Sequence, residues 1–368
     1  MKYYIIAGEA SGDLHAANLM KELVLRDPLA EFRCWGGDKM QAAGGVLVKH
    51  YRDLAFMGFI EVIANLPTIL RNLDFCKKDI VDFNPDVVLL VDYPGFNLRI
   101  ATFTKSKGIK TFYYISPQIW AWKQSRVHQI KRDVDAMFVI LPFEQAFYKR
   151  FGMEVFFEGH PLLDAMKDIP NVGTFRERHQ LGRKDLIALL PGSRKQEIKK
   201  MLPIMLEAVS KHDNWEPIIA GVSVHDLKFY QEIAGDKSIK VIYGETYQLL
   251  LNSKAAAVTS GTATLEAGLF GVPLVVCYKG GNVSYQIAKR LIKVKYISLV
   301  NLILDSPAVK ELIQHQLTPE KLRIELELIM ENTEERSQVI SKLQQLQSIS
   351  GGEGASSRVA EKMLSLLS

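Results

Sequence analysis

Short apolar runs alternate with helix-length amphipathic segments along most of this 368-residue chain. In the first half, strands are predicted at Tyr3–Ala7, Val87–Val91, Thr111–Ile115, Met137–Leu141 and Val155–Phe157, with a helix over Leu14–Arg26. The pattern then starts again, with strands predicted at Leu186–Leu190, Pro217–Ala220, Lys240–Tyr243, Ala256–Thr259 and Leu274–Cys277. Runs that are continuously apolar rather than alternating are typical of parallel strands covered by helices on both faces.

This repetition predicts an α/β protein built from two doubly wound, Rossmann-like domains that face a central cleft. We expect residues 1–165 to form the first domain and residues 166–347 the second, which ends in a long helical region over Pro319–Leu346. Residues 348–368 are predicted to form a flexible loop, Ser348–Ser357, and a last helix, Arg358–Leu367, that docks back on the first domain. In such folds, ligands bind at the carboxyl ends of the strands, so polar motifs there are the candidates for a site.

Composition narrows the class of protein. The chain is 48% hydrophobic and 24% charged, as is usual for a soluble enzyme, and its net charge of +5 gives no reason to expect a nucleic-acid partner. Basic clusters at residues 123–132, 195–200 and 289–295 are either solvated helix faces or surfaces that attract phosphate, on a membrane or on a substrate. The three cysteines are far apart and predict reduced, buried thiols in a cytoplasmic protein.

A loop of small and acidic residues follows the first predicted strand and opens a helix. Its candidates for binding a ligand are Gly8, Glu9, Ser11, Gly12 and Asp13. Glycines allow close backbone approach, and a helix N-terminus offers unpaired N–H groups to an anion. The spacing is not Gly-x-Gly-x-x-Gly, so NAD binding is not supported. The alternative for Asp13 is that it caps the helix.

Asp92 ends the very apolar strand Val87–Val91, where a carboxylate would face the cleft as a general base requires. The alternative is a turn residue, because Pro94 and Gly95 follow. Ser116, Trp120 and Trp122 come after the next strand. The two tryptophans predict either a platform for a sugar or acyl chain, or simple packing.

The second half carries two phosphate-type loops. Gly192, Ser193 and Arg194 lie between a strand and a helix, where Arg194 can bind two phosphate oxygens, unless it forms a structural salt bridge instead. The run after another strand supplies Ser260, Gly261, Thr262, Thr264 and Glu266. Glu266 could accept both hydroxyls of a ribose or could serve a capping box.

We expect neither a catalytic metal nor a cofactor. Asp133 and Asp135 have the Asp-x-Asp spacing that holds a metal in some nucleotide-sugar transferases. They precede a strand, however, and therefore belong to the amino end of the sheet, away from the predicted cleft.

Together these motifs resemble the lipid-A-disaccharide synthase family. The resemblance rests on residues 8–13, 57–62, 116–122, 141–144, 190–194, 260–266 and 298–302, in the family's order. It implies a GT-B fold and transfer of 2,3-diacylglucosamine from its UDP ester to 2,3-diacylglucosamine 1-phosphate, giving a β-1,6 disaccharide phosphate plus UDP. It also implies essential roles for Asp92 and Arg194, and it places Asn301 near the nucleotide. Many members carry a second aspartate where this chain has Gly95, which assigns the base role to Asp92.

Apolar residues of the first domain predict contact with acyl chains and a peripheral position on the cytoplasmic face of the inner membrane. They are Phe56, Met57, Phe59, Ile60 and Ile63. Arg52, Arg71, Lys77 and Lys78 flank them, as in membrane-surface helices; the alternative is ordinary core. Three rival functions stay open: a nucleotide-sugar epimerase, a peptidoglycan-type transferase acting on a lipid carrier, and a non-catalytic nucleotide-sugar binding protein. The chain is expected to be a monomer or a homodimer.

Overall fold

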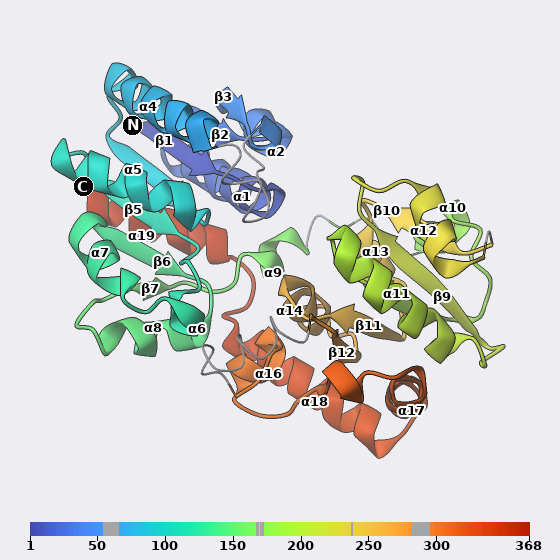
Figure 1. The fold of residues 1–368 in the computed structure, drawn as a ribbon. Helices are drawn as coiled ribbons and strands as arrows, with labels where there is room; N and C mark the ends of the chain where they lie inside the picture. Colours follow the sequence, from blue (N-terminus) through green and yellow to red (C-terminus); the bar gives the residue numbers. More distant parts are fainter. Residues whose placement is uncertain (54–65, 167–168, 170–172, 237, 282–294) are drawn as a thin grey trace. The chain divides into compact units, whose positions relative to one another are not determined.

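The computed structural model describes residues 1–53, 66–166, 169, 173–236, 238–281 and 295–368. The chain forms two compact units, Met1–Ala165 with Ser350–Ser368, and Met166–Ile349. Each unit is a parallel sheet with helices between its strands (Figure 1). The predicted fold class of two doubly wound parallel sheets is therefore confirmed.

Unit 1 contains a seven-stranded sheet in the order β3-β2-β1-β4-β5-β6-β7. Its strands are β1 (Lys2–Ala7), β2 (Glu31–Gly36), β3 (Val46–His50), β4 (Val87–Val91), β5 (Thr111–Tyr114), β6 (Ala136–Val139) and β7 (Phe156–Phe157). Its helices are α1 (Ala10–Arg26), α2 (Asp38–Ala42), α4 (Leu66–Phe83), α5 (Pro94–Ser106), α6 (Ile119–Trp122), α7 (Arg126–Asp133), α8 (Pro142–Lys149), α9 (Leu162–Ala165) and α19 (Ala355–Leu367).

Unit 2 contains a six-stranded sheet in the order β10-β9-β8-β11-β12-β13. Its strands are β8 (Asp185–Leu190), β9 (Trp215–Gly221), β10 (Lys240–Tyr243), β11 (Ala255–Thr259), β12 (Leu274–Tyr278) and β13 (Lys310–Ile313). Its helices are α10 (Gly173–Arg178), α11 (Lys195–Val209), α12 (Leu227–Ala234), α13 (Thr246–Asn252), α14 (Thr262–Leu269), α16 (Leu299–Leu304), α17 (Pro319–Met330) and α18 (Glu334–Ile349).

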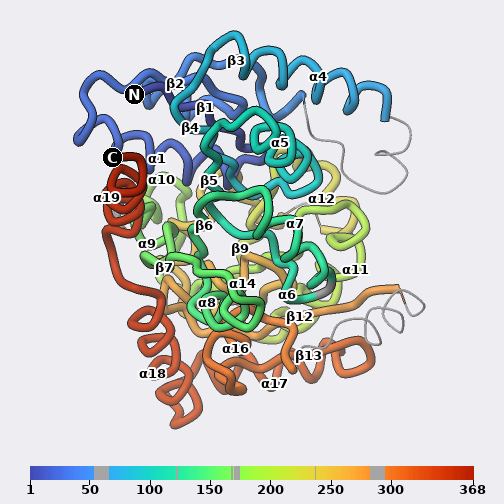
Figure 2. Tube along the Cα trace, turned by 90° about the vertical axis from the view of Figure 1, so that its left-hand side faces the viewer, coloured from blue at the N-terminus to red at the C-terminus, as the bar shows by residue number. Residues whose placement is uncertain are grey.

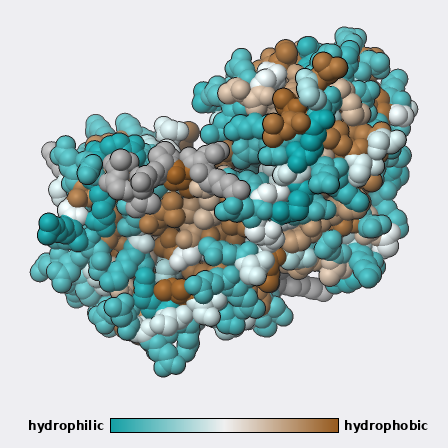
Figure 3. Space-filling view, turned by 180° about the vertical axis from the view of Figure 1, so that it is seen from behind, coloured by the Kyte–Doolittle hydropathy of each residue, from teal (hydrophilic) through white to brown (hydrophobic). Residues whose placement is uncertain are grey.

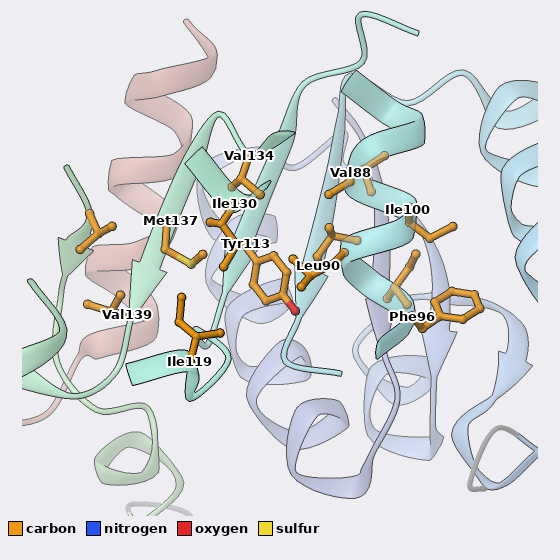
Figure 4. Packing of buried hydrophobic residues seen from close by; sticks show 14 of the residues in the cluster. Val88, Leu90, Phe96, Ile100, Tyr113, Ile119, Ile130, Val134, Met137 and Val139 are labelled. Carbon is orange, nitrogen blue, oxygen red and sulfur yellow. The ribbon is translucent and has the colours of Figure 1, made fainter. Parts of the chain in front are cut away.

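The core of unit 1 explains why its strands are apolar at every position. Val88 and Leu90 of β4 belong to the cluster under α5 and α7, where Figure 4 shows them beside Phe96 and Ile100. Val87 and Leu89 point to the opposite face and pack with α1 and α19. Because successive side chains of a strand point to opposite faces, burial of both faces requires a continuous apolar run.

Three strands were missing from the predicted set. They are β2, β3 and β13. β3 and β13 are edge strands of their sheets. An edge strand is covered less completely, so charged residues such as Lys49 and Lys310 interrupt its apolar pattern.

The C-terminal region also differs from its prediction. The expected single helical region is two helices, because the Thr333 hydroxyl accepts from the N–H of Arg336 and caps α18. The expected loop at 348–357 is shorter, since α18 runs to Ile349 and α19 begins at Ala355. Asp164 holds the start of α19 by accepting from the backbone N–H groups of Gly354, at 2.6 Å, and Ser356, at 2.7 Å.

The last helix, α19, packs against α1 within unit 1 (Figure 2). Over the face drawn in Figure 3, hydrophilic residues cover most of the surface and hydrophobic residues gather in patches between them. Within the described ranges, no helix combines the length and apolar character that a membrane span requires.

Candidate active site

The strand order of unit 1 creates a place where a ligand can bind. β1 and β4 are neighbours, with Ala7 opposite Val91, and the chain leaves them toward opposite sides of the sheet. At such a switch point, the loops beyond the carboxyl ends diverge and leave a crevice. Glu9 follows β1 and Asp92 follows β4, so the switch point brings two carboxylates from distant parts of the sequence together.

Asp92 is held in an uncommon backbone conformation. Asp92 and Tyr93 have φ angles of +45° and +48°, in the left-handed region that residues other than glycine rarely adopt. The Asp92 carbonyl accepts hydrogen bonds from the Tyr113 hydroxyl at 2.5 Å and the Asn97 amide at 2.8 Å; Figure 4 shows the Tyr113 hydroxyl in red. Such strain persists when the surroundings over-determine the backbone, and it is common at functional sites.

The environment of Asp92 makes its carboxyl a proton acceptor near neutral pH. Burial raises its pKa to about 6, and the nearby charge of Glu9 adds to the rise. A hydrogen bond from the backbone of Tyr93 opposes it. A base is most effective when its pKa lies near the working pH, so this site is suited to general-base catalysis.

The first loop separates into exposed and buried parts. Glu9 and Ser11 are exposed, whereas Gly12 is buried, and a Cβ there would lie 3.2 Å from that of Ala7. Gly8 lies beneath the ring of Tyr93, which leaves no room for a side chain. The two glycines therefore let the loop pack closely between the ends of β1 and β4.

Asp13 has a structural role that the sequence did not indicate. Its carboxylate accepts from the backbone N–H groups of Gly37 at 2.7 Å, Met40 at 3.1 Å and Lys39 at 3.2 Å, and so caps α2. Its side chain is buried, with 2% exposure. This corrects both expectations for Asp13: it does not cap its own helix, and its carboxylate is occupied inside the protein rather than available to an acceptor.

The loop after β5 is packed rather than open. The Ser116 hydroxyl lies 2.7 Å from that of Tyr148, and the Trp120 ring packs edge-on against Phe143 with centroids 5.0 Å apart. Beside them, burial raises the pKa of Glu144 to about 7. For Trp120, the structure favours the packing interpretation over a ligand platform. Trp122 ends α6, and its side chain lies outside the described part of the chain.

Unit 2 has the same kind of switch point between β8 and β11. Gly192, with φ +106°, turns the chain after β8, and the exposed residues Ser193 and Arg194 lead into α11. The Arg194 guanidinium donates to Glu197 at 2.8 Å, which is the salt bridge left open as an alternative. Because 73% of the arginine side chain is exposed, this pair is weak and a phosphate can displace the carboxylate.

The loop after β11 faces this arginine loop across the switch point. Thr262 is exposed at the first turn of α14, and the Ser260 hydroxyl donates to the carbonyl of Ile297 at 3.1 Å. Thr264 does not face a ligand: its side chain is fully buried, and its hydroxyl donates to the carbonyl of Gly261 at 2.8 Å. The expectation that Thr264 contacts the donor is corrected accordingly.

Glu266 makes no capping box, which was the structural alternative for this residue. Gly261 is the N-cap of α14, and the Glu266 carboxylate instead accepts from the Tyr247 hydroxyl at 3.0 Å. Burial raises the pKa of Glu266, and the bond from Tyr247 opposes this. A carboxylate held at the edge of the switch point remains suited to bind ribose hydroxyls.

Asn301 is engaged inside the protein. Its side chain is 1% exposed, and its amide donates to the carbonyl of Val309 and to Glu311, both at 2.9 Å, while its oxygen accepts from the N–H of Val309. Asn301 was expected among the donor-binding residues near the nucleotide, whereas its side chain is turned inward and has no surface left for a ligand. Glu311 also accepts from the N–H groups of Ile297 and Ser298, and Ile297 in turn accepts from Ser260. Asn301 and Glu311 therefore support the Ser260 loop from behind.

The remaining predicted positions lie elsewhere. Asp135 accepts from the N–H of Thr111, at the start of β5, and Asp133 is paired with Arg132, so both lie at the amino end of the sheet. The described residues contain no group of three or more His, Cys, Asp or Glu side chains arranged to hold a metal. Phe56, Met57, Phe59, Ile60 and Ile63 lie outside the described residues.

Comparison with known proteins identifies the family. The family model described as lipid-A-disaccharide synthetase matches residues 3–365. The lipid-A-disaccharide synthase of Syntrophus aciditrophicus is 39% identical over 99% of this chain and 97% of its own length. That of Nitrosococcus oceani is 38% identical, covering 99% and 95%. The chain belongs to the lipid-A-disaccharide synthase family.

Membership of the lipid-A-disaccharide synthase family makes this chain a glycosyltransferase of lipid A biosynthesis, acting on a nucleotide-sugar donor and an acceptor. Solved structures agree on the fold. A UDP-GlcNAc 2-epimerase from Methanocaldococcus jannaschii, in complex with UDP-GlcNAc and UDP, matches with a TM-score of 0.67 at 15% identity, covering 100% of both chains. The calicheamicin glycosyltransferase matches with 0.61 at 16% identity, covering 100% and 98%. These likenesses show the GT-B fold alone. It is the family match over residues 3–365 and the similar synthases that disfavour the epimerase alternative.

Three residues near these loops were not found from the sequence. Tyr247 and Glu197 each contact a predicted donor residue, and Glu311 supports the Ser260 loop. Glu197 alone left a local signal, because it lies three residues after Arg194 at the start of a helix. Tyr247 and Glu311 left no such signal, because they are distant in the sequence from the residues that they contact in the fold.

Proposed function

We propose that this glycosyltransferase moves 2,3-diacylglucosamine from its UDP ester to the 6-hydroxyl of 2,3-diacylglucosamine 1-phosphate. The products are a β-1,6-linked disaccharide phosphate and UDP, and the anomeric carbon is inverted. The family match over residues 3–365 supports this choice of reaction. The buried Asp92 carboxyl at the switch point of unit 1, with its pKa raised to about 6, is the observation that carries the mechanism.

Inversion requires a single displacement. Asp92 accepts the proton of the acceptor's 6-hydroxyl as that oxygen forms a bond to the anomeric carbon. The bond from the anomeric carbon to the phosphate oxygen breaks, and its electron pair leaves with UDP. Asp92 suits this role because its carbonyl is anchored by Tyr113 and Asn97, so little reorganisation is needed when the substrate arrives.

The donor is assigned to unit 2. The diphosphate binds at the exposed N-terminus of α11, where Arg194 exchanges Glu197 for phosphate oxygens and stabilises the charge that grows on UDP. Gly192, Ser193, Ser260, Gly261 and Thr262 form the surrounding loops. Glu266 accepts the ribose hydroxyls. The acceptor is assigned to unit 1, near Glu9, Ser11 and Asp92.

The transfer is proposed to need no metal. Asp133 and Asp135 have the spacing of some metal sites, but Asp133 pairs with Arg132, and Asp135 pairs with Lys105 and accepts from the N–H of Thr111. Activity should therefore survive excess EDTA, and Asp135→Asn should change the rate little. Loss of activity in EDTA that magnesium restores would contradict this proposal.

The substrates' acyl chains imply work at a lipid surface, and we propose peripheral attachment to the inner membrane through unit 1. Leu66, Leu70 and Phe75 of α4 are exposed apolar residues, with Arg71 and Lys78 exposed on the same helix. Apolar side chains with cationic neighbours are typical of helices that lie on anionic membranes. In the sequence, these residues follow directly after segment 56–63, for which membrane contact is predicted.

One assay tests the proposed reaction. UDP release is measured with acylated donor and acceptor together, with each omitted, and with non-acylated analogues. We expect release only when both acylated substrates are present. Conversion of UDP-N-acetylglucosamine without an acceptor would indicate an epimerase, transfer to a lipid-carrier acceptor would indicate a peptidoglycan-type enzyme, and UDP binding without release would indicate a binding protein.

A further inference from the structure

Tyr247 and Glu266 form a contact between two neighbouring helices of unit 2. Tyr247 lies in the first turn of α13, before β11, and Glu266 lies in α14, after β11. The tyrosine hydroxyl donates to Oε1 of the glutamate at 3.0 Å. The tyrosine ring is itself held by Phe270, whose ring centroid is 5.0 Å away.

The contact leaves part of the carboxylate available. In the part of unit 2 that the structure describes, Oε2 of Glu266 receives no hydrogen bond, and Oε1 has a second lone pair beyond the one used by Tyr247. A glutamate side chain loses rotamer freedom when it binds a ligand, and a prior hydrogen bond reduces that loss. Burial raises the pKa of Glu266, and the hydrogen bond from Tyr247 opposes this rise by favouring the ionised carboxylate.

We infer that Tyr247 is a positioning residue for the donor's ribose: it orients the Glu266 carboxylate so that both 2′- and 3′-hydroxyls are recognised, and thereby sets the preference for a ribonucleotide over a 2′-deoxyribonucleotide. The inference rests on the proposed function, in which Glu266 binds the ribose. It adds a residue that touches no substrate and acts through its neighbour. A structural role alone would lower stability but would not change the discrimination between the two sugars.

The chain offers a matched control. Tyr243, at the end of β10 in the same unit, has a buried hydroxyl that makes no hydrogen bond within the described residues. Tyr243→Phe and Tyr247→Phe therefore remove the same atom. Only the second removes a contact to Glu266, while the ring contact with Phe270 is kept.

The experiment measures the affinities of the full-length protein for UDP and 2′-deoxy-UDP by calorimetry. The proteins compared are wild type, Tyr247→Phe, Tyr243→Phe, Glu266→Ala and the Tyr247→Phe/Glu266→Ala double variant. We expect Tyr247→Phe to weaken UDP by roughly two- to tenfold, the usual range for one hydrogen bond, and to weaken 2′-deoxy-UDP less, because that nucleotide keeps only the 3′-hydroxyl. Tyr243→Phe should keep the wild-type ratio, and the double variant should match Glu266→Ala alone. In turnover, Tyr247→Phe should raise the donor KM and largely retain kcat.

Each result decides between outcomes. If Glu266→Ala abolishes the preference for UDP but Tyr247→Phe leaves it intact, the inference is wrong and the proposed ribose site stands. If Glu266→Ala itself leaves the preference intact, the ribose assignment fails and the inference fails with it. Equal weakening of both nucleotides by Tyr247→Phe, or full additivity in the double variant, also contradicts it. Should Tyr247→Phe unfold at a markedly lower temperature, Glu266→Asp tests the same contact by withdrawing the carboxylate, and it must lower the ratio.

Discussion

The carboxylates of Asp92 and Glu9 interact across the switch point between β4 and β1, although they lie 83 positions apart in the sequence, and the charge of Glu9 helps burial to raise the Asp92 pKa to about 6. A raised carboxyl pKa means that the proton is held more tightly in the folded protein than in the unfolded chain. The ionised base is therefore fully present only above this pKa, and it is lost as the pH falls through about 6.

The first prediction concerns pH. The kcat/KM of the enzyme should fall on the acid side with a midpoint near pH 6, the pKa of Asp92 in the free protein. Glu9→Gln removes a neighbouring negative charge, so the midpoint should move to lower pH. Glu22→Gln, which alters an exposed pair with Arg26 on the same helix, is the control and should leave the profile unchanged. An acid limb that does not respond to Glu9→Gln would mean that another group titrates.

Asp92→Asn should lower kcat by roughly 10²–10⁴-fold, because an amide cannot accept the proton. UDP affinity should barely change, since the donor is assigned to unit 2. The variants Asp13→Asn and His15→Ala in the first turns of α1 should act mainly on stability. Asp13 caps α2, and burial lowers the pKa of His15 to about 4, which leaves it neutral at working pH. If Asp92→Asn keeps most of the wild-type kcat while Asp13→Asn, His15→Ala or Glu9→Gln loses it, the general base has been misassigned.

Arg194→Ala should lower kcat by about 10²–10³-fold, as for other donors that stabilise developing charge, and should weaken UDP. Arg194→Lys should recover little, because an ammonium cannot replace a bidentate guanidinium. The control is Lys200→Ala, a charge removed from the exposed part of the same helix. Near-normal turnover by Arg194→Lys would contradict a bidentate contact between Arg194 and phosphate.

Glu311→Gln should disturb the donor loop without touching the substrate. The carboxylate accepts from Ile297, Ser298 and Asn301, and hydrogen bonds to a charged group are each worth about 1.5–3 kcal/mol. We expect a lower unfolding temperature, because the three hydrogen bonds to Glu311 are weakened. We also expect a donor KM raised about tenfold, because the Ser260 loop loses part of its support. Glu325→Gln, which removes only the partly buried carboxylate of α17 that pairs with the exposed Lys310 of the same strand as Glu311, should change neither quantity. An unchanged donor KM at a lowered unfolding temperature would limit Glu311 to stability.

Membrane attachment is tested on both parts of the apolar segment. Phe59→Glu with Ile60→Glu, and separately Leu70→Glu with Phe75→Glu, should move the protein from vesicles of anionic phospholipid into solution. Leu70 and Phe75 are 52% and 48% exposed. Because Phe75 also contacts the buried Trp35, the unfolding temperature of the second variant is compared with that of the wild type. Raised salt should weaken attachment if Arg71 and Lys78 contribute. Unchanged partitioning of both folded variants would show that the segment has another role.

The sequence alone determined the architecture and the main site loops. Continuous apolar runs could only be strands covered on both faces, and the polar residues at their carboxyl ends had to lie at one edge of each sheet. Asp92 and Arg194 could therefore be singled out before their surroundings were known. Weakly patterned edge strands such as β3 and β13 could not be found, because partial exposure removes the apolar signal.

Only the tertiary structure decided which partner each polar side chain has. Asp13 bonds to α2 rather than to its own helix, Asn301 turns inward to Glu311, and Glu266 meets Tyr247 instead of capping α14. Periodicity in a sequence reports how one element is buried, since it reflects local geometry. The partner of a carboxylate or an amide depends on which elements become neighbours, and that follows from the order of strands in the sheet. Residues that are distant in the sequence meet only after both sheets have formed.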